Sequence, residues 1–209
     1  MSVLNKLASA QNRNDEVPNQ ILAKELADSG DKAAVKELVD NLSNRDKNIQ
    51  SDCIKVLYEI GALKPELIAA YVDNFIALLR GRNNRLVWGA MTALGAIATL
   101  KAADIWRQID IVMRSTELGS AITQDWGIRV LAAVSAADPA HEKKILPLLK
   151  TFLQNCRPKD LPRHAESVLP AINTTNRQEI ATVLEARVAS LRPPQAKRLE
   201  KVLRAIKAL

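Results

Sequence analysis

The sequence predicts an all-α protein built from repeated pairs of helices, and three observations lead to this prediction. Apolar residues recur at helical spacing, and the pattern of one helix returns 37 residues further along the chain. Glycine and proline separate the periodic stretches. Only 3% of the residues are aromatic, while alanine and leucine are abundant, a composition that favours helices over sheets.

The first helices of successive pairs share one apolar pattern. The pattern begins with Val35, Leu38, Val39 and Leu42, which occupy positions i, i+3, i+4 and i+7 of an amphipathic helix. Adding 37 to these residue numbers three times gives twelve further positions, and 14 of the 16 positions in the four helices are apolar. A repeat this regular indicates stacked units, because the apolar face of each unit is covered by its neighbours.

The second helices repeat in the same way. Cys53, Val56, Leu57 and Ile60 form the first apolar stripe, and steps of 37, 37, 38 and 34 residues lead to four more. The two patterns predict six helical pairs, at residues 3–29, 33–61, 69–100, 101–137, 140–173 and 175–208. The first pair matches least well, as expected of a terminal capping unit. The last pair ends on a basic amphipathic helix.

The stretch Asn83–Leu100 is predicted to be a helix in the middle of this stack. It carries no charge between Leu86 and Leu100, whereas a helix at a protein surface normally has a charged face. We therefore expect its partner helix and both neighbouring pairs to cover it. Small residues such as Gly89 and Gly95 would allow the close approach, and Trp88 would face the remaining open side.

The repeat resembles a known family. Two-helix units of this length, with an Ala-Leu-Gly pattern such as Ala93–Gly95 in the second helix, resemble HEAT repeats. The resemblance implies one domain over residues 1–209, a right-handed α-solenoid whose second helices line a concave surface for binding. The Asp and Arg ladder typical of such repeats is absent, because Gln50, Val87 and Gln124 occupy the Arg position. The curvature of the solenoid therefore stays open.

Charge points to the same concave surface. The chain has 30 Lys and Arg residues against 23 Asp and Glu, a net charge of +7. Helical angles place four rows of residues opposite the core, and these rows contain seven cations and two carboxylates. Tryptophan and arginine often dominate binding hot spots. The predicted partner-binding residues are Lys55, Arg85, Trp88, Asp125, Trp126, Arg129, Arg163, His164, Lys197 and Lys201.

The predicted function is a non-catalytic, cytoplasmic scaffold that binds an acidic protein partner along this basic groove, without a cofactor or a membrane. Two cysteines make no disulfide framework, and the amino terminus does not read as a signal peptide. The longest uncharged run is shorter than the roughly 20 residues that span a bilayer. Another interpretation also stays open: the cations solvate an ordinary exposed face, and Trp88 belongs to the core.

Two other functions are alternatives. A nucleic-acid binder would place the same cations on phosphates and stack bases on the tryptophans. The chain also resembles HEAT-like alkylpurine DNA glycosylases, which implies Trp106, Asp110 and Arg129 as the residues that hold a damaged nucleotide. Only 19 positions separate Asp110 from Arg129, too few for the helices that this family places between them.

The chain offers little for a metal site. It has two histidines and two cysteines, and a protein metal site usually needs three or four ligands at close spacing. The densest polar cluster, residues 156–166, has a structural interpretation. Arg157 and Lys159 would complement the carboxyl end of one helix, and Asp160 would cap the next.

Overall fold

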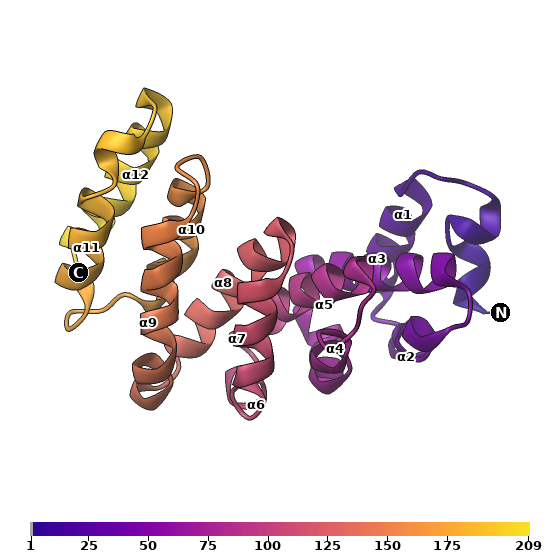
Figure 1. The fold of residues 1–209 in the computed structure, drawn as a ribbon. Helices are drawn as coiled ribbons and strands as arrows, with labels where there is room; N and C mark the ends of the chain where they lie inside the picture. The colour runs from indigo at the N-terminus through magenta and orange to yellow at the C-terminus, as the bar shows by residue number, and fades with distance from the viewer. Residues whose placement is uncertain (1) are drawn as a thin grey trace. The chain divides into compact units, whose positions relative to one another are not determined.

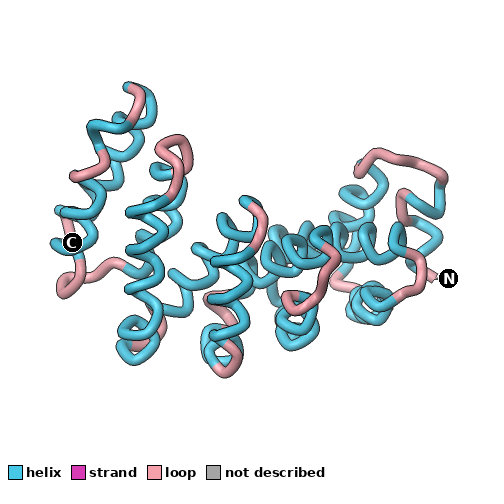
Figure 2. The backbone as a smooth tube through the Cα atoms, viewed as in Figure 1, coloured by secondary structure: helices cyan, strands magenta, loops and turns pink. Residues whose placement is uncertain are grey.

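The computed structural model describes residues 2–209, which fold into helices joined by short loops, with no strand in that range (Figures 1 and 2). The helices follow one another as the predicted six pairs. The chain divides into two compact units, Met1–Gly127 and Ile128–Leu209, called unit 1 and unit 2 below. The single domain over residues 1–209 stays a prediction.

Unit 1 contains the first three pairs and most of the fourth. The first members of these pairs are short helices, several of them broken into 3-10 turns: η1 (Val3–Lys6), η2 (Ser9–Gln11), α2 (Lys32–Asp40), η3 (Asn41–Ser43), η4 (Pro65–Leu67), η5 (Ala69–Tyr71), α4 (Val72–Leu78), α6 (Ala102–Trp106) and α7 (Ile109–Leu118). The second members are α1 (Val17–Ser29), α3 (Lys47–Leu63), α5 (Asn84–Ile97) and α8 (Ala121–Ser135), whose last residues belong to unit 2.

Unit 2 contains the last two pairs. Their elements are α9 (Pro139–Asn155), α10 (Leu161–Val168), η6 (Leu169–Ala171), α11 (Arg177–Glu185), η7 (Val188–Ser190) and α12 (Pro193–Lys207). Within this unit α10 packs on α12, and α9 packs on α11. The second helices thus lie beside each other, as they do in unit 1, where α3 contacts both α1 and α5.

Side-chain caps set the start of many helices. Asp31, Asp46, Asn83 and Asp138 precede α2, α3, α5 and α9, and each accepts a hydrogen bond from a backbone N–H of the first turn. Gly30 ends α1 with a φ of 68°, a left-handed conformation that glycine adopts without strain. These local signals mark where the four helices begin and where α1 ends.

The prediction for the first pair was wrong in part. Residues 3–11 form only two short 3-10 turns, and Asn12, with a φ of 53°, ends the second of them in a left-handed conformation. The chain then runs exposed to α1, which starts at Val17. Helical stretches this short depend on tertiary packing for their stability.

The apolar stripes form the core of each unit. Cys53, Val56, Leu57 and Ile60 are all fully buried in α3. The uncharged part of α5, which begins after Arg85, is covered as expected, since Met91, Leu94 and Ile97 have no exposed surface. A Cβ at Gly89 would lie 2.7 Å from the Ile54 side chain, so glycine is what allows α5 to approach α3 this closely. In unit 2, Leu149, Leu153, Val168 and Leu199 are fully buried.

Candidate partner-binding surfaces

Trp88, on α5 of unit 1, is half-buried rather than enclosed in the core. Its ring centre is 5.7 Å from that of Tyr58, on the neighbouring helix α3. The Arg85 guanidinium stacks over the Trp88 ring at 4.3 Å, one helical turn away on α5. The three side chains form an amphipathic surface, in which Tyr58 and Trp88 supply the apolar rings and Arg85 supplies the positive charge.

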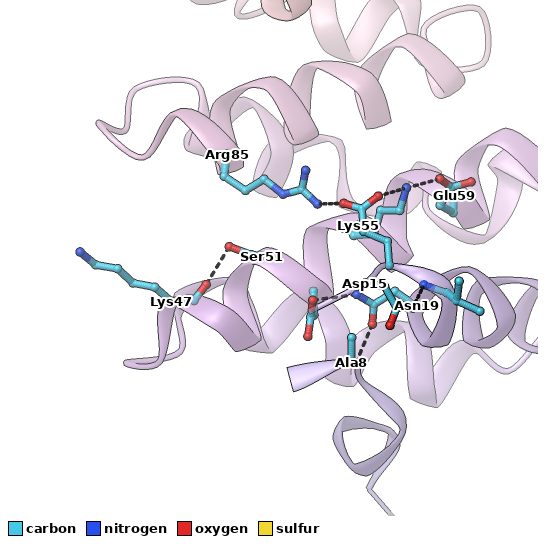
Figure 3. Close-up of polar contacts among 11 residues, drawn as sticks. Ala8, Asp15, Asn19, Lys47, Ser51, Lys55, Glu59 and Arg85 are labelled. Carbon is cyan, nitrogen blue, oxygen red and sulfur yellow. Dashed lines mark hydrogen bonds and ion pairs between the residues drawn. The ribbon is translucent and has the colours of Figure 1, made fainter. Parts of the chain in front are cut away.

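A carboxylate already occupies this surface. One oxygen of Glu16 lies 2.9 Å from the Lys55 ammonium, and the other lies 2.6 Å from the Arg85 guanidinium. Lys55 also pairs with Glu59 at 2.6 Å, as Figure 3 shows. Lys55 is only 5% exposed. The prediction that Lys55 is an exposed cation of the groove is therefore wrong, because two acids enclose it.

These pairs favour the charged forms of Lys55 and Glu16. Burial lowers the pKa of Lys55, but hydrogen bonds to Glu59 and Glu16 outweigh it and raise that pKa above its ordinary value. Burial raises the pKa of Glu16, but hydrogen bonds from Lys55 and Arg85 outweigh it and lower that pKa. Two cations thus face two carboxylates around Trp88, and the local charge nearly cancels.

Trp126 packs against a glycine. A Cβ at Gly95 would lie 2.5 Å from Cε3 of the Trp126 indole, so the ring rests directly on the α5 backbone. Trp126 and Asp125 are both half-buried in the first turns of α8. Trp126 therefore has a packing role within unit 1 in addition to any role in binding.

Unit 2 presents the other predicted cations. Arg163 of α10 and Lys197 and Lys201 of α12 are exposed, and so is Arg129 in α8. His164 is only 4% exposed, so its prediction as a surface residue is wrong. Successive residues of an α-helix are rotated by about 100° about its axis, so His164 and Arg163 lie on different sides of α10. That rotation places His164 with the buried residues Leu161, Ala165 and Val168.

The polar cluster between α9 and α10 is arranged differently from the prediction. Asp160 makes no capping hydrogen bond, and instead pairs with Arg157 at 2.7 Å and with Arg163 at 3.1 Å. The carboxyl end of α9 is satisfied by Arg187, which donates to the carbonyl oxygens of Leu153 and Cys156 at 3.0 and 2.8 Å. Nothing in the local sequence indicates this contact, because Arg187 lies 34 residues beyond Leu153.

The two units differ strongly in charge. Residues 1–127 contain 15 Lys and Arg against 16 Asp and Glu, a net charge of −1, whereas residues 128–209 contain 15 against 7, a net charge of +8. The whole positive surplus thus belongs to unit 2. All three tryptophans belong to unit 1, and Phe152 is the one aromatic residue of unit 2.

The enzymatic residues do not form one site within either unit. Trp106 and Asp110 belong to α6 and α7 of unit 1, and Arg129 belongs to unit 2. Glu142, next to His141 in the first turn of α9, accepts hydrogen bonds from Asn173 and Asn176 at 2.8 and 3.0 Å. It therefore joins the start of α9 to the loop before α11.

The described residues were compared with the requirements of a metal site, a reactive thiol and a membrane-spanning helix. Across residues 2–209 no three His, Cys, Asp or Glu side chains lie where they could hold a metal ion together. Burial raises the pKa of Cys53 to about 12, and burial also raises that of Cys156, so neither thiol ionises readily. None of the helices in the described part is long and apolar enough to cross a membrane.

The stacked helical pairs define an α-solenoid of the HEAT and armadillo type. Among solved structures, a designed armadillo repeat protein in complex with the peptide (KR)4 is similar, with 14% identity, a TM-score of 0.69, and coverage of 90% of this chain and 86% of that one. An engineered protein from a structural genomics consortium has 21% identity, a TM-score of 0.63 and coverage of 100% and 98%. Computationally designed armadillo repeat proteins for modular peptide recognition have 15% identity, a TM-score of 0.63 and coverage of 97% and 98%. At these identities the likeness shows the fold alone.

No protein-family model matches the chain, and a search of curated proteins finds no match.

Proposed function

We propose that the protein is a non-catalytic scaffold that binds an acidic segment of a partner protein. The binding surface is the basic face of unit 2, defined here as Arg163, Lys197, Lys201 and Arg204. The observation that carries the proposal is the charge of unit 2, which has the whole positive surplus of the chain in 82 residues. Lys55 and His164 are left out, because both are buried.

The geometry of α12 supports this surface. Lys197, Lys201 and Arg204 recur at spacings of four and three residues, so they share one side of the helix. Leu199, Val202 and Ile206, on another side, are buried. Within residues 2–209 neither Lys197 nor Arg204 makes an ion pair. A fixed helix thus presents cations that are available to an acidic partner.

The fold supports binding rather than chemistry. The structural neighbours are repeat scaffolds, one of them in complex with a peptide and others designed for peptide recognition. The peptide of that complex, (KR)4, is basic, whereas the surface proposed for this chain is itself basic. We therefore propose an acidic partner here. Arg85, Trp88, Asp125, Trp126 and Arg129 remain candidates for additional contacts.

The separation of charge from aromatic residues favours a protein partner over single-stranded nucleic acid. A single-strand binder combines a cationic groove with aromatic platforms for the bases. Here the basic face has no aromatic residue, and the tryptophans belong to the unit with a net charge of −1. An acidic protein segment needs only the cations.

The experiment is a titration of the full chain with fluorescein-labelled polyglutamate and, separately, with duplex DNA of equal charge at the same salt concentration, read by fluorescence anisotropy. The variant Lys201→Glu/Arg204→Glu reverses two charges on the basic face. The control Lys143→Glu/Lys159→Glu makes the same charge change at two exposed lysines of unit 2 outside it.

We expect the basic-face variant to lose at least about tenfold in affinity for polyglutamate, and the control to lose much less. Equal losses in the two variants would mean that only net charge matters, and the proposed surface would be wrong. Tighter binding of DNA than of polyglutamate, lost in the same variant, would replace the protein partner with a nucleic acid.

A further inference from the structure

Unit 1 contains a pocket that none of the ten predicted partner-binding residues lines. It has a volume of about 690 Å³ and lies between the end of α4, the start of α5, and α7 with the loop that follows it. Ligand sites commonly measure about 300–1,000 Å³. The wall combines apolar side chains with three arginines: Leu79, Ile111 and Leu118, and Arg80, Arg82 and Arg114.

The arginines converge from two parts of unit 1. Arg80 and Arg82 flank Gly81 in the loop between α4 and α5, and Arg114 projects from α7. All three are exposed, and none makes an ion pair with another residue of the described chain. Asp110 also lines the pocket, which leaves a local surplus of positive charge in a unit whose net charge is −1.

The apolar wall is also exposed. Leu118 is 75% exposed, the largest value among the exposed large apolar side chains of the described residues. It adjoins the half-buried Ile111 and the buried Leu79. When a ligand covers an exposed leucine at the mouth of a pocket, the burial of apolar surface favours binding.

We infer that this pocket binds a short acidic segment of a protein that carries one bulky apolar side chain. That side chain inserts between Leu79, Ile111 and Leu118. Carboxylates on either side of it pair with Arg80, Arg82 and Arg114, because the planar guanidinium matches a carboxylate with two parallel hydrogen bonds. The inference is independent of the basic face, since it uses other residues in the other unit.

Two observations favour a peptide over a nucleic acid. No aromatic residue lines the pocket, so bases would have no ring on which to stack. The net charge of −1 on unit 1 also disfavours the approach of a long polyanion, whereas a short segment meets only the local arginines. The apolar wall further selects for a ligand with an apolar side chain.

The test is an array of short peptides in which one central position, varied over all amino acids, is flanked on both sides by aspartate and glutamate. The full chain, labelled with a fluorophore, is applied as wild type and as variants. Arg80→Gln/Arg82→Gln and Arg114→Gln remove the cations, and Leu118→Ser removes the exposed apolar contact. Arg45→Gln and Leu63→Ser are matched controls, since both residues are exposed in unit 1 and lie outside the pocket.

We expect wild type to bind peptides with leucine, methionine or phenylalanine at the centre, and to bind the serine-centred peptide at least about tenfold more weakly. The pocket variants should lose this binding about tenfold or more, and the two controls should retain it. The pocket proposal is overturned if no centre is preferred, or if binding survives in the pocket variants. Binding that is lost only in Lys201→Glu/Arg204→Glu belongs to the basic face, which would leave the proposed function intact and contradict the pocket.

Discussion

Glu16 and Arg85 lie 69 positions apart in the chain, yet a carboxylate oxygen of Glu16 is 2.6 Å from the Arg85 guanidinium. The same carboxylate reaches Lys55, so the residue before α1 joins α3 and α5 through one acid. Arg85 in turn covers the Trp88 ring. This contact determines how much of the surface around Trp88 is available to a partner, and it leads to the first two predictions.

Glu16→Gln should lower the free energy of unfolding by less than about 1 kcal/mol, because the Glu16 side chain is 45% exposed and water screens the pairs. Urea unfolding at neutral pH measures the change. Glu66→Gln, an exposed glutamate elsewhere in unit 1, should leave the midpoint unchanged. A loss of several kcal/mol in Glu16→Gln would show that the triad of Glu16, Lys55 and Arg85 is a major determinant of stability.

The contribution of Glu16 should depend on pH. Its pKa in the folded state is lowered below the ordinary value of 4.5, so the ionised form stabilises the folded state at pH values above 4.5. The contribution is lost as the pH falls through the lowered pKa. The stability difference between wild type and Glu16→Gln should therefore be present at neutral pH and shrink progressively as the pH falls below 4.5. A difference that persists there would indicate that the amide changes packing rather than charge.

Trp88→Ala should cost about 1–2 kcal/mol of stability, less than the roughly 3–5 kcal/mol of a buried tryptophan. The ring is half-buried and contacts Tyr58 and Arg85, so its removal leaves a smaller cavity than removal of an enclosed ring. Thermal or urea unfolding of the variant gives the value. A loss above about 3 kcal/mol would assign Trp88 to the core, which is the alternative that the sequence leaves open.

Gly95→Ala should destabilise unit 1 by about 1–3 kcal/mol, although alanine is the better helix former by about 1 kcal/mol. The new Cβ would meet the Trp126 ring at 2.5 Å, and the indole would have to move. Unfolding experiments in the wild-type and Trp126→Leu backgrounds complete a double-mutant cycle. Gly95→Ala should cost much less in the second background, and equal costs in both would mean that the strain arises elsewhere.

The sequence predicts the fold well because the repeat is a local pattern. Spacing within each helix identifies the buried stripe, and the caps at Asp31, Asp46 and Asn83 mark where helices begin. The pairing of Glu16 with Arg85 has no such signal, since it depends on how three helices stack. The prediction for His164 was wrong for another reason. It placed His164 on the same surface as its neighbour Arg163, although successive residues of a helix are rotated by about 100°.

The charge difference between the two units is present in the sequence but was not predicted. The net charge is −1 over residues 1–127 and +8 over residues 128–209, and only the position of the division comes from the structure. The pocket of Arg80, Arg82 and Arg114 could not be found in this way. Its arginines come from a loop and from a first helix, whereas the predicted binding surface consists of second helices.

Arg187 has a consequence for the dynamics of unit 2. This one guanidinium, located just after α11, accounts for hydrogen bonds to the carbonyl oxygens of Leu153, Gln154 and Cys156 at the end of α9. Opening the end of α11 therefore removes partners from α9 as well, and the two segments fluctuate as one cooperative element. Hydrogen exchange of the backbone amides in the last turn of α9 should then follow the same opening free energy as those of α11.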